Sequence, residues 1–78
     1  MTAPNETNAR IVLSRHTLAT YEAGAIAEAE PVATAAMIRK EITILQAFAM
    51  AHPEKAITLG DLVRRWQALG DRLKERLN

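Results

Sequence analysis

Two histidines and one carboxylate are the residues of this chain best suited to chemistry, as metal ligands or as acid and base groups. His16 and His52 have no second histidine or carboxylate at the spacing that a zinc site needs. Glu41 stands among apolar residues and could act as a general acid if buried, since desolvation disfavours the charged carboxylate. No nucleophile, second carboxylate or phosphate-binding glycine loop accompanies it. The sequence therefore predicts no enzyme, no metal site and no cofactor, and it assigns Glu41 to a structural ion pair or an interface contact.

Arginine is the other charged residue with a clear pattern. Arg65, Arg72 and Arg76 line one margin of the apolar face of the C-terminal segment, as arginines do in proteins that contact a nucleic-acid backbone. The alternative is that they flank a helix–helix contact and pair with acids, as residues beside coiled-coil cores do. We favour this alternative, because the same segment carries offsetting acids at Asp61, Asp71 and Glu75. We expect Arg65 or Arg72 to be the partner of Glu41 across an interface.

A segment near the N-terminus resembles the recognition-helix end of lambda-repressor-like helix-turn-helix domains. The resemblance covers 11 of the 78 residues and rests on Ser14, Arg15, Thr17, Leu18, Ala19, Tyr21, Glu22 and Gly24. It implies a helix that reads DNA. That fold places two helices ahead of the recognition helix, whereas only 13 residues precede Ser14. We therefore favour an ordinary helix here and keep nucleic-acid binding as the alternative.

The elements that must position these residues are helices, and the clearest boundaries are those of residues 31–51. Pro31 suits a first helical turn, and the residue before Pro53 is pushed out of the α region. Glu41 divides the apolar arc of this helix into two stripes. The stripes are Ile38, Ile42, Leu45 and Ala49, and then Met37, Ile44 and Phe48. Two stripes predict two packing partners.

Helical periodicity also predicts a helix over residues 58–77 and a weaker one over residues 9–29. In the former, Trp66 is in phase with leucines and is expected in the core, and Thr58 with Asp61 has the spacing of an N-terminal capping pair. In the latter, Gly24 weakens a helix interior by about 1 kcal/mol relative to alanine, so a break there stays open. Ile11, Leu18, Tyr21 and Ala25 form its expected inner side, with Val12, Ala19 and Ile26 adjoining them. Residues 1–8 are polar and aperiodic and are expected to be a disordered lead.

Composition indicates one small domain with a thin core, residues 9–78. Hydrophobic residues are 49% of the chain but aromatic residues only 4%, and there is no cysteine. A chain of this size buries about 60–65% of its unfolded surface, so association would add stability. The net charge of +1 is too small for a typical dedicated nucleic-acid protein. No secretory signal or apolar run of about 20 residues is present, so we expect a cytoplasmic protein with no membrane contact.

These patterns predict an all-α, three-helix domain in which helices 31–51 and 58–77 form an antiparallel hairpin. The first helix packs across the hairpin or is exchanged with a partner. The leading hypothesis is a protein–protein interaction module, a homo-oligomer or an accessory subunit for another protein. The alternative is a small dimeric nucleic-acid-binding regulator that uses the basic third helix. The predicted interface residues are Met37, Ile38, Glu41, Ile44, Leu45, Phe48, Arg65, Trp66 and Arg72.

Overall fold

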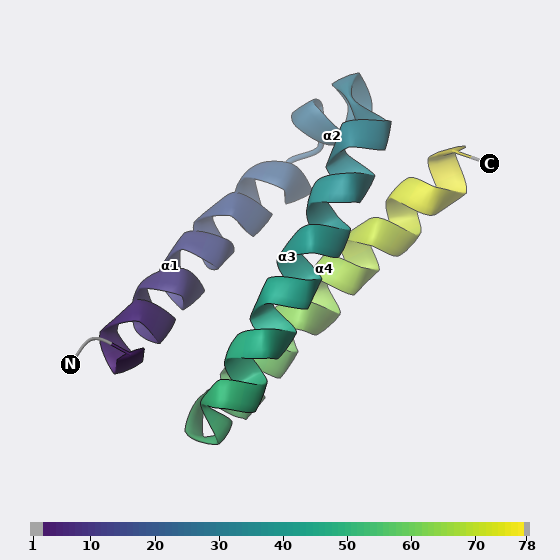
Figure 1. Ribbon diagram of the computed structural model, residues 1–78. Helices are drawn as coiled ribbons and strands as arrows, with labels where there is room; N and C mark the ends of the chain where they lie inside the picture. The colour runs from purple at the N-terminus through teal and green to yellow at the C-terminus, as the bar shows by residue number, and fades with distance from the viewer. Residues whose placement is uncertain (1–2, 78) are drawn as a thin grey trace.

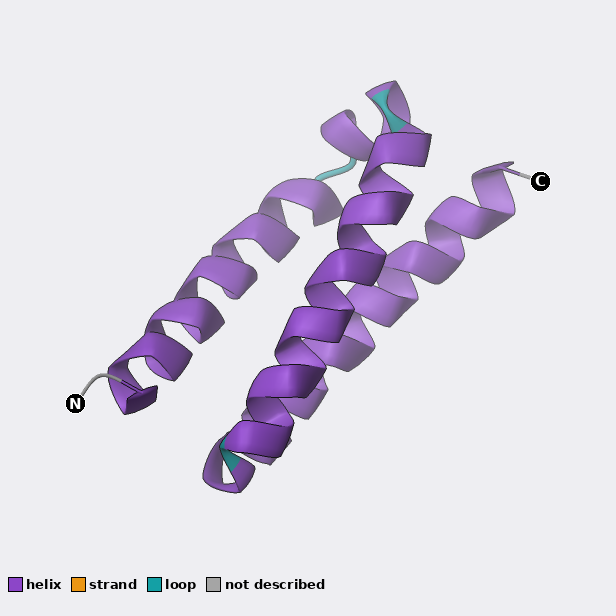
Figure 2. Cartoon of the chain, in the orientation of Figure 1, coloured by secondary structure: helices purple, strands orange, loops and turns teal. Residues whose placement is uncertain are grey.

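Prolines and one glycine divide the chain into its helices. The computed structural model describes residues 3–77, which form α1 (Ala3–Glu22), α2 (Ala25–Ala29), α3 (Pro31–Ala51) and α4 (Ala56–Leu77), with a single 3₁₀ turn, η1 (Pro53–Lys55), before α4. Across this range the regular structure is helical throughout, as Figure 2 shows. The predicted all-α class is confirmed.

The bounds of α3 are those that the sequence predicts. Pro31 takes the first helical position, where its missing N–H costs nothing. His52 leaves the helix with φ −132° and ψ 75°, because Pro53 disfavours the α region for the residue before it. Two prolines therefore set both ends of the helix that organises the fold.

The helical segment predicted over residues 9–29 is not continuous, because the chain turns at Gly24. Gly24 has φ +97°, a left-handed conformation that glycine adopts without a Cβ penalty. α1 consequently ends at Glu22, and α2 is a separate short helix that leads into α3. The break that the sequence left open is the observed one.

The N-terminal boundary also differs from the prediction, since α1 begins at Ala3 instead of residue 9. Residues 3–8, expected to be a disordered lead, are helical, while residues 1–2 lie outside the described range. Pro4 falls in the first turn, where proline is tolerated, and Glu6 is favoured there by the helix dipole. Thr7 is fully buried, so this end of α1 also has tertiary support that no local pattern reveals.

α4 begins at Ala56, two residues before the predicted start at Thr58. It continues from η1, so Thr58 lies inside the helix and the predicted capping pair with Asp61 was wrong. Asp61 instead makes an exposed ion pair with Arg64, at 3.3 Å and three residues away along the same helix. The apolar periodicity therefore predicts the body of α4 correctly and misses only its first turn.

α3 and α4 run side by side in opposite directions, and α1 lies along one side of this hairpin (Figure 1). α1 therefore packs on the hairpin of its own chain. Trp66 has 0% of its surface exposed, which confirms the predicted burial. The core residues are Ile11 and Leu18 from α1, Ile38 and Leu45 from α3, and Leu59, Leu62, Val63, Trp66, Leu69 and Leu73 from α4.

Candidate functional site

A buried hydrogen bond fixes α1 against α4. The indole Nε1 of Trp66 donates to Ser14 Oγ at 2.9 Å, and both side chains are almost completely buried. The ring of Tyr21 packs at a tilted angle of 56° to the indole, with 6.3 Å between ring centroids. A buried indole N–H requires an acceptor, and Ser14 is small enough to supply one without separating the helices.

Glu41 contacts α1 through an ion pair with Arg10, whose Nη2 donates to its carboxylate. The carboxylate is on the side of α3 that faces α1, so the expected partners Arg65 and Arg72 were wrong. Glu41 is only 8% exposed, and Arg10 Nε is buried with no hydrogen-bond partner among the described residues 3–77. The prediction that Glu41 belongs to a structural ion pair is confirmed, with the partner inside the same chain.

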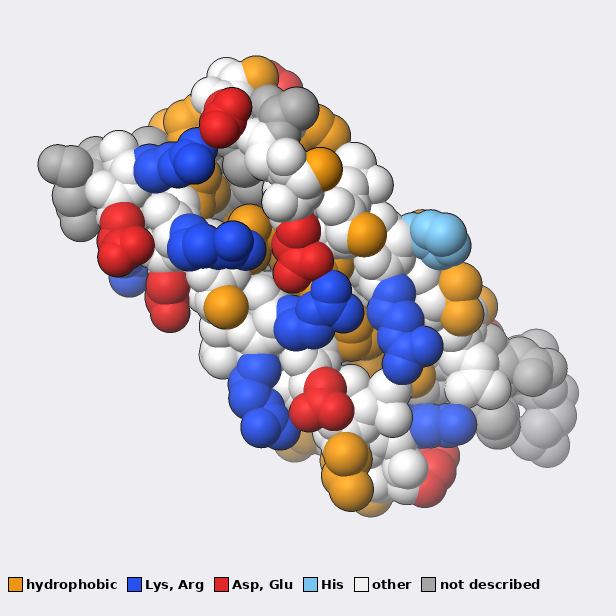
Figure 3. Space-filling view, turned by 180° about the vertical axis from the view of Figure 1, so that it is seen from behind, with side chains coloured by type: hydrophobic (Ala, Val, Ile, Leu, Met, Phe, Trp, Pro, Cys, Tyr) orange, Lys and Arg blue, Asp and Glu red, His pale blue; other side chains and the backbone are white. Residues whose placement is uncertain are grey.

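Two arginines of α4 pair with acids of other helices. Arg65 donates from Nη2 to Glu22 on α1 at 2.9 Å, and Arg76 donates from Nη1 to Glu28 on α2 at 3.1 Å. The preferred interpretation of the row is thus confirmed for these two, although the acids lie outside α4. Arg72 is exposed and makes no ion pair within residues 3–77. From behind, the molecule shows Lys and Arg side chains spread over one face with carboxylates set between them (Figure 3).

The predicted interface residues fall into three groups. Ile38, Leu45 and Trp66 are buried inside the chain, where they build the core, and Glu41 is buried in its pair with Arg10. Met37, Ile44 and Phe48 are half-buried, and Arg65 and Arg72 are exposed. Contact of these residues with a second chain stays a prediction. Both stripes of α3 contact the core, since Ile38, Ile42, Leu45 and Ala49 of the first and Met37 and Phe48 of the second belong to it or pack against it.

A groove lies between α3 and α4, and sequence reasoning missed it. It encloses about 270 Å³, and its floor consists of Ala35, Ile38, Ile42 and Gly70. Arg39, Gln67, Asp71 and Lys74 line its rim. The only sequence signal is Gly70, which interrupts the apolar arc of α4 with a residue that has no side chain. Without a side chain at position 70, the groove stays open.

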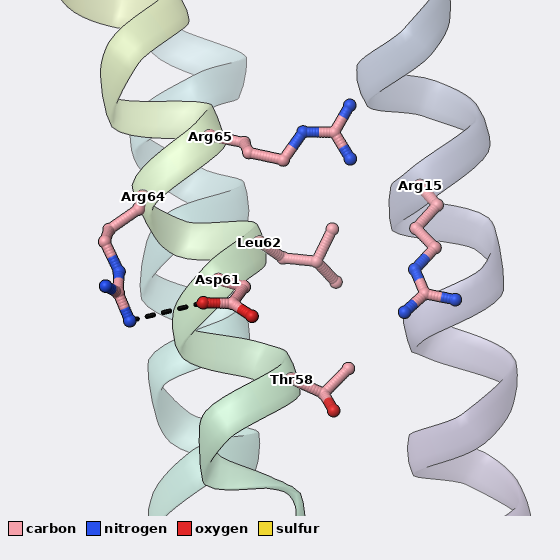
Figure 4. Close-up of a pocket in the computed structure, with 6 residues that line it drawn as sticks. All are labelled: Arg15, Thr58, Asp61, Leu62, Arg64 and Arg65. Carbon is pink, nitrogen blue, oxygen red and sulfur yellow. Dashed lines mark ion pairs between the residues drawn. The ribbon is translucent and has the colours of Figure 1, made fainter.

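A second cleft, of about 530 Å³, separates α1 from α4. Its lining residues are Arg15, Thr58, Asp61, Leu62, Arg64 and Arg65, drawn in Figure 4. Arg65 on α4 extends toward α1, and Arg15 runs along α1, whereas Arg64 turns away to meet Asp61. Sequence reasoning missed Arg15 as a site residue because its neighbours in the cleft are more than 40 positions away.

No group of three or more histidine, cysteine or acidic side chains in residues 3–77 could hold a metal ion. His52 stacks on Phe48, with ring centroids 6.5 Å apart, and its Nδ1 is 3.4 Å from the Glu54 carboxylate. None of the described helices is both long enough and apolar enough to span a membrane.

Comparison with protein-family models, with curated proteins and with solved structures gives no match to this chain.

Proposed function

We propose that this protein is a helical protein–protein interaction module that binds a second copy of itself through the α3/α4 groove. The observation that carries the proposal is an apolar floor on the side of the hairpin that α1 leaves uncovered. Around the axis of α3, Ile42 lies about 100° from Glu41, which contacts α1. Around the axis of α4, Gly70 lies about 140° from Arg65. The groove therefore faces away from α1, where another helix can complete a bundle.

The charge pattern of the rim favours a second copy as the occupant. Arg39 and Lys74 carry positive charge, and Asp71 carries negative charge. In a two-fold arrangement the same surface meets itself, so Asp71 of one copy can lie opposite Lys74 or Arg39 of the other. A rim with both signs supports self-association through such complementarity.

Exposed apolar residues extend this surface beyond the groove. Val32 is 73% exposed and Met50 is 84% exposed. Val32 lies seven residues before Arg39 and Met50 eleven residues after it, so both are within about 20° of Arg39 around the axis of α3. They place one exposed apolar side chain toward each end of the groove side of this helix, about 27 Å apart. A 78-residue chain buries a modest share of its surface alone, so covering these side chains and the groove adds stability that the core cannot supply.

Sedimentation equilibrium over a dilution series tests the proposal. We expect a mass of twice 8.6 kDa at micromolar concentration, with dissociation to single chains on dilution. A mass of one chain at every concentration up to about a millimolar would overturn self-association, because a contact weaker than that releases only about 4 kcal/mol.

The alternative function is a small nucleic-acid-binding regulator. The basic face in Figure 3 favours it, but Arg65 and Arg76 are already held by Glu22 and Glu28. Binding to a duplex of mixed sequence distinguishes the two functions. An affinity that falls steeply as salt rises, in a chain that stays monomeric, would favour the regulator.

A further inference from the structure

The α1/α4 cleft concentrates cationic donors that the protein itself does not use. Its lining carries three arginines against one aspartate, and Asp61 is engaged by Arg64 on the outer side of α4. Arg15 makes no hydrogen bond or ion pair within residues 3–77, and Arg65 uses only Nη2, for Glu22. A guanidinium has five N–H donors, so most of the donors of Arg15 and Arg65 are left for water or a ligand.

The two guanidiniums come from different helices and enter the same space. Figure 4 shows Arg65 reaching from α4 toward α1 and Arg15 running along α1, and both side chains line the cleft. The Thr58 side chain points into the same gap below them, and Leu62 lies between Thr58 and Arg65. Glu22 offsets part of the charge of Arg65, whereas Arg15 has no ion pair within residues 3–77, so the cleft keeps positive charge that attracts an anion.

We propose that this cleft binds the phosphoryl group of a phosphate-containing ligand, with Arg15 and Arg65 on opposite sides of the anion and the Thr58 hydroxyl as a further donor. This site is separate from the α3/α4 groove, and its function goes beyond self-association. The volume of about 530 Å³ falls in the range of small-molecule sites and leaves room for a group attached to the phosphate.

A phosphoryl group fits this arrangement better than a carboxylate does. A carboxylate has two oxygens, and one guanidinium can occupy both in a bidentate pair. A phosphoryl group presents three oxygens and up to two negative charges, so it can bridge two guanidiniums that approach from different helices. Leu62 offers an apolar surface for the attached group, next to the charged end of the cleft.

Ligand binding here would link α1 to α4. α1 is held to the hairpin by a few specific polar contacts, among them the Trp66 to Ser14 hydrogen bond and the Arg65 to Glu22 pair. A phosphate bridging Arg15 and Arg65 adds another such link, and it forms only when α1 is docked. A ligand that binds only the folded chain raises the melting temperature, and the stabilisation grows with the logarithm of the ligand concentration once this exceeds the Kd.

Isothermal titration with pyrophosphate at low ionic strength tests the proposal on the full chain. We expect saturable binding with one site per chain, and Arg15→Gln and Arg65→Gln should each weaken the affinity at least about tenfold. Lys40→Gln is the matched control, because it removes the same charge from an exposed position on α3 and should leave the affinity within about twofold. Arg15 is exposed and unpaired in the described chain, so Arg15→Gln should fold normally, which its far-UV circular dichroism and melting curve check.

Three results would overturn the proposal. The first is no saturable binding of pyrophosphate by the folded wild-type chain. The second is equal weakening by Arg15→Gln and Lys40→Gln, which would show attraction to net charge and no specific site. The third is unchanged binding in Arg15→Gln and Arg65→Gln, which would place the ligand elsewhere.

A parallel titration identifies the source of the phosphoryl group. A single-stranded oligonucleotide is tested at the same total phosphate concentration and in the same variants. Tighter binding of pyrophosphate assigns the site to a phosphorylated small molecule. Tighter binding of the oligonucleotide, lost in Arg15→Gln and steeply salt-dependent, assigns it to a nucleic-acid backbone. Both results support phosphoryl recognition by Arg15 and Arg65.

Discussion

Trp66 and Ser14 are 52 positions apart in the sequence, and their side chains share a 2.9 Å hydrogen bond in the core. This bond shows how α1 is attached to the hairpin. The buried face of α1 alternates Thr7 and Ser14 with Ile11 and Leu18, so it presents less apolar surface than α3 or α4 does. The docking of α1 therefore depends on specific polar partners as well as on hydrophobic burial.

Ser14→Ala should destabilise the fold by about 1–3 kcal/mol, because the buried Trp66 N–H then has no acceptor. Urea unfolding monitored by Trp66 fluorescence measures this free energy of unfolding. Thr20→Ala is the control, since Thr20 is exposed and bonds only to the backbone of its own helix, and it should change the free energy by about 0.5 kcal/mol or less. Equal effects of the two substitutions would show that the buried hydrogen bond adds nothing to the free energy of unfolding.

Glu41→Gln should also destabilise the fold by about 1–3 kcal/mol, because Arg10 keeps a largely buried charge without its carboxylate. The double variant Arg10→Met/Glu41→Leu should recover most of this loss, since apolar side chains of similar volume need no ionic partner. Asp61→Asn, which breaks an exposed pair, should cost about 0.5 kcal/mol or less. A double variant less stable than Glu41→Gln would contradict this account of the pair.

Gly24→Ala should cost about 1–2 kcal/mol, because alanine is strained in the left-handed conformation at φ +97°. No atom lies within 4 Å of the added Cβ, so the cost is purely conformational. Gly24→Asn should cost less, since asparagine tolerates this region better. Thermal unfolding of the three proteins checks the order, and an alanine variant as stable as wild type would show that the turn is not held at this φ.

The sequence predicts the helices of this chain better than it predicts which residues of different helices contact one another. Pro31 and Pro53 mark both ends of α3, and the leucine spacing around Trp66 predicts the buried face of α4. α1 was harder, because Thr7 and Ser14 on its buried face look like solvent-facing residues, whereas Val12, expected beside the inner face, is 54% exposed. Polar residues that are buried only through a tertiary partner leave no periodic signal.

The partner of Glu41 illustrates the same limit. Local reasoning shows that no cation on α3 can reach its carboxylate, so another helix must supply one. Which helix does so depends on the side on which α1 docks, and the phase of α3 alone cannot decide between Arg10 and Arg65. The two clefts were missed for the same reason, because each is formed by residues from two separate helices.

We propose that the chain associates with itself through the α3/α4 groove. One matched pair of variants tests whether the dimer contact lies at this groove. Gly70 lines the groove, and a Cβ there lies at an ordinary 3.5 Å from Ile38 Cγ2, so Gly70→Gln can fold with its side chain filling the groove. Gly60 is on the same helix outside the groove, and a Cβ there meets only the flexible end of Arg64, at 3.9 Å. Both substitutions should stabilise the isolated chain by up to about 1 kcal/mol, since glutamine favours helix over glycine.

The deciding measurement is the dimer dissociation constant of wild type, Gly60→Gln and Gly70→Gln by sedimentation equilibrium. We predict that Gly70→Gln weakens association at least about tenfold, as expected when a polar side chain blocks the centre of a contact. Gly60→Gln should leave the constant within about twofold of wild type, because its side chain lies outside the groove. Equal dissociation constants for the two variants, or a wild-type chain that never dimerises, would contradict the account.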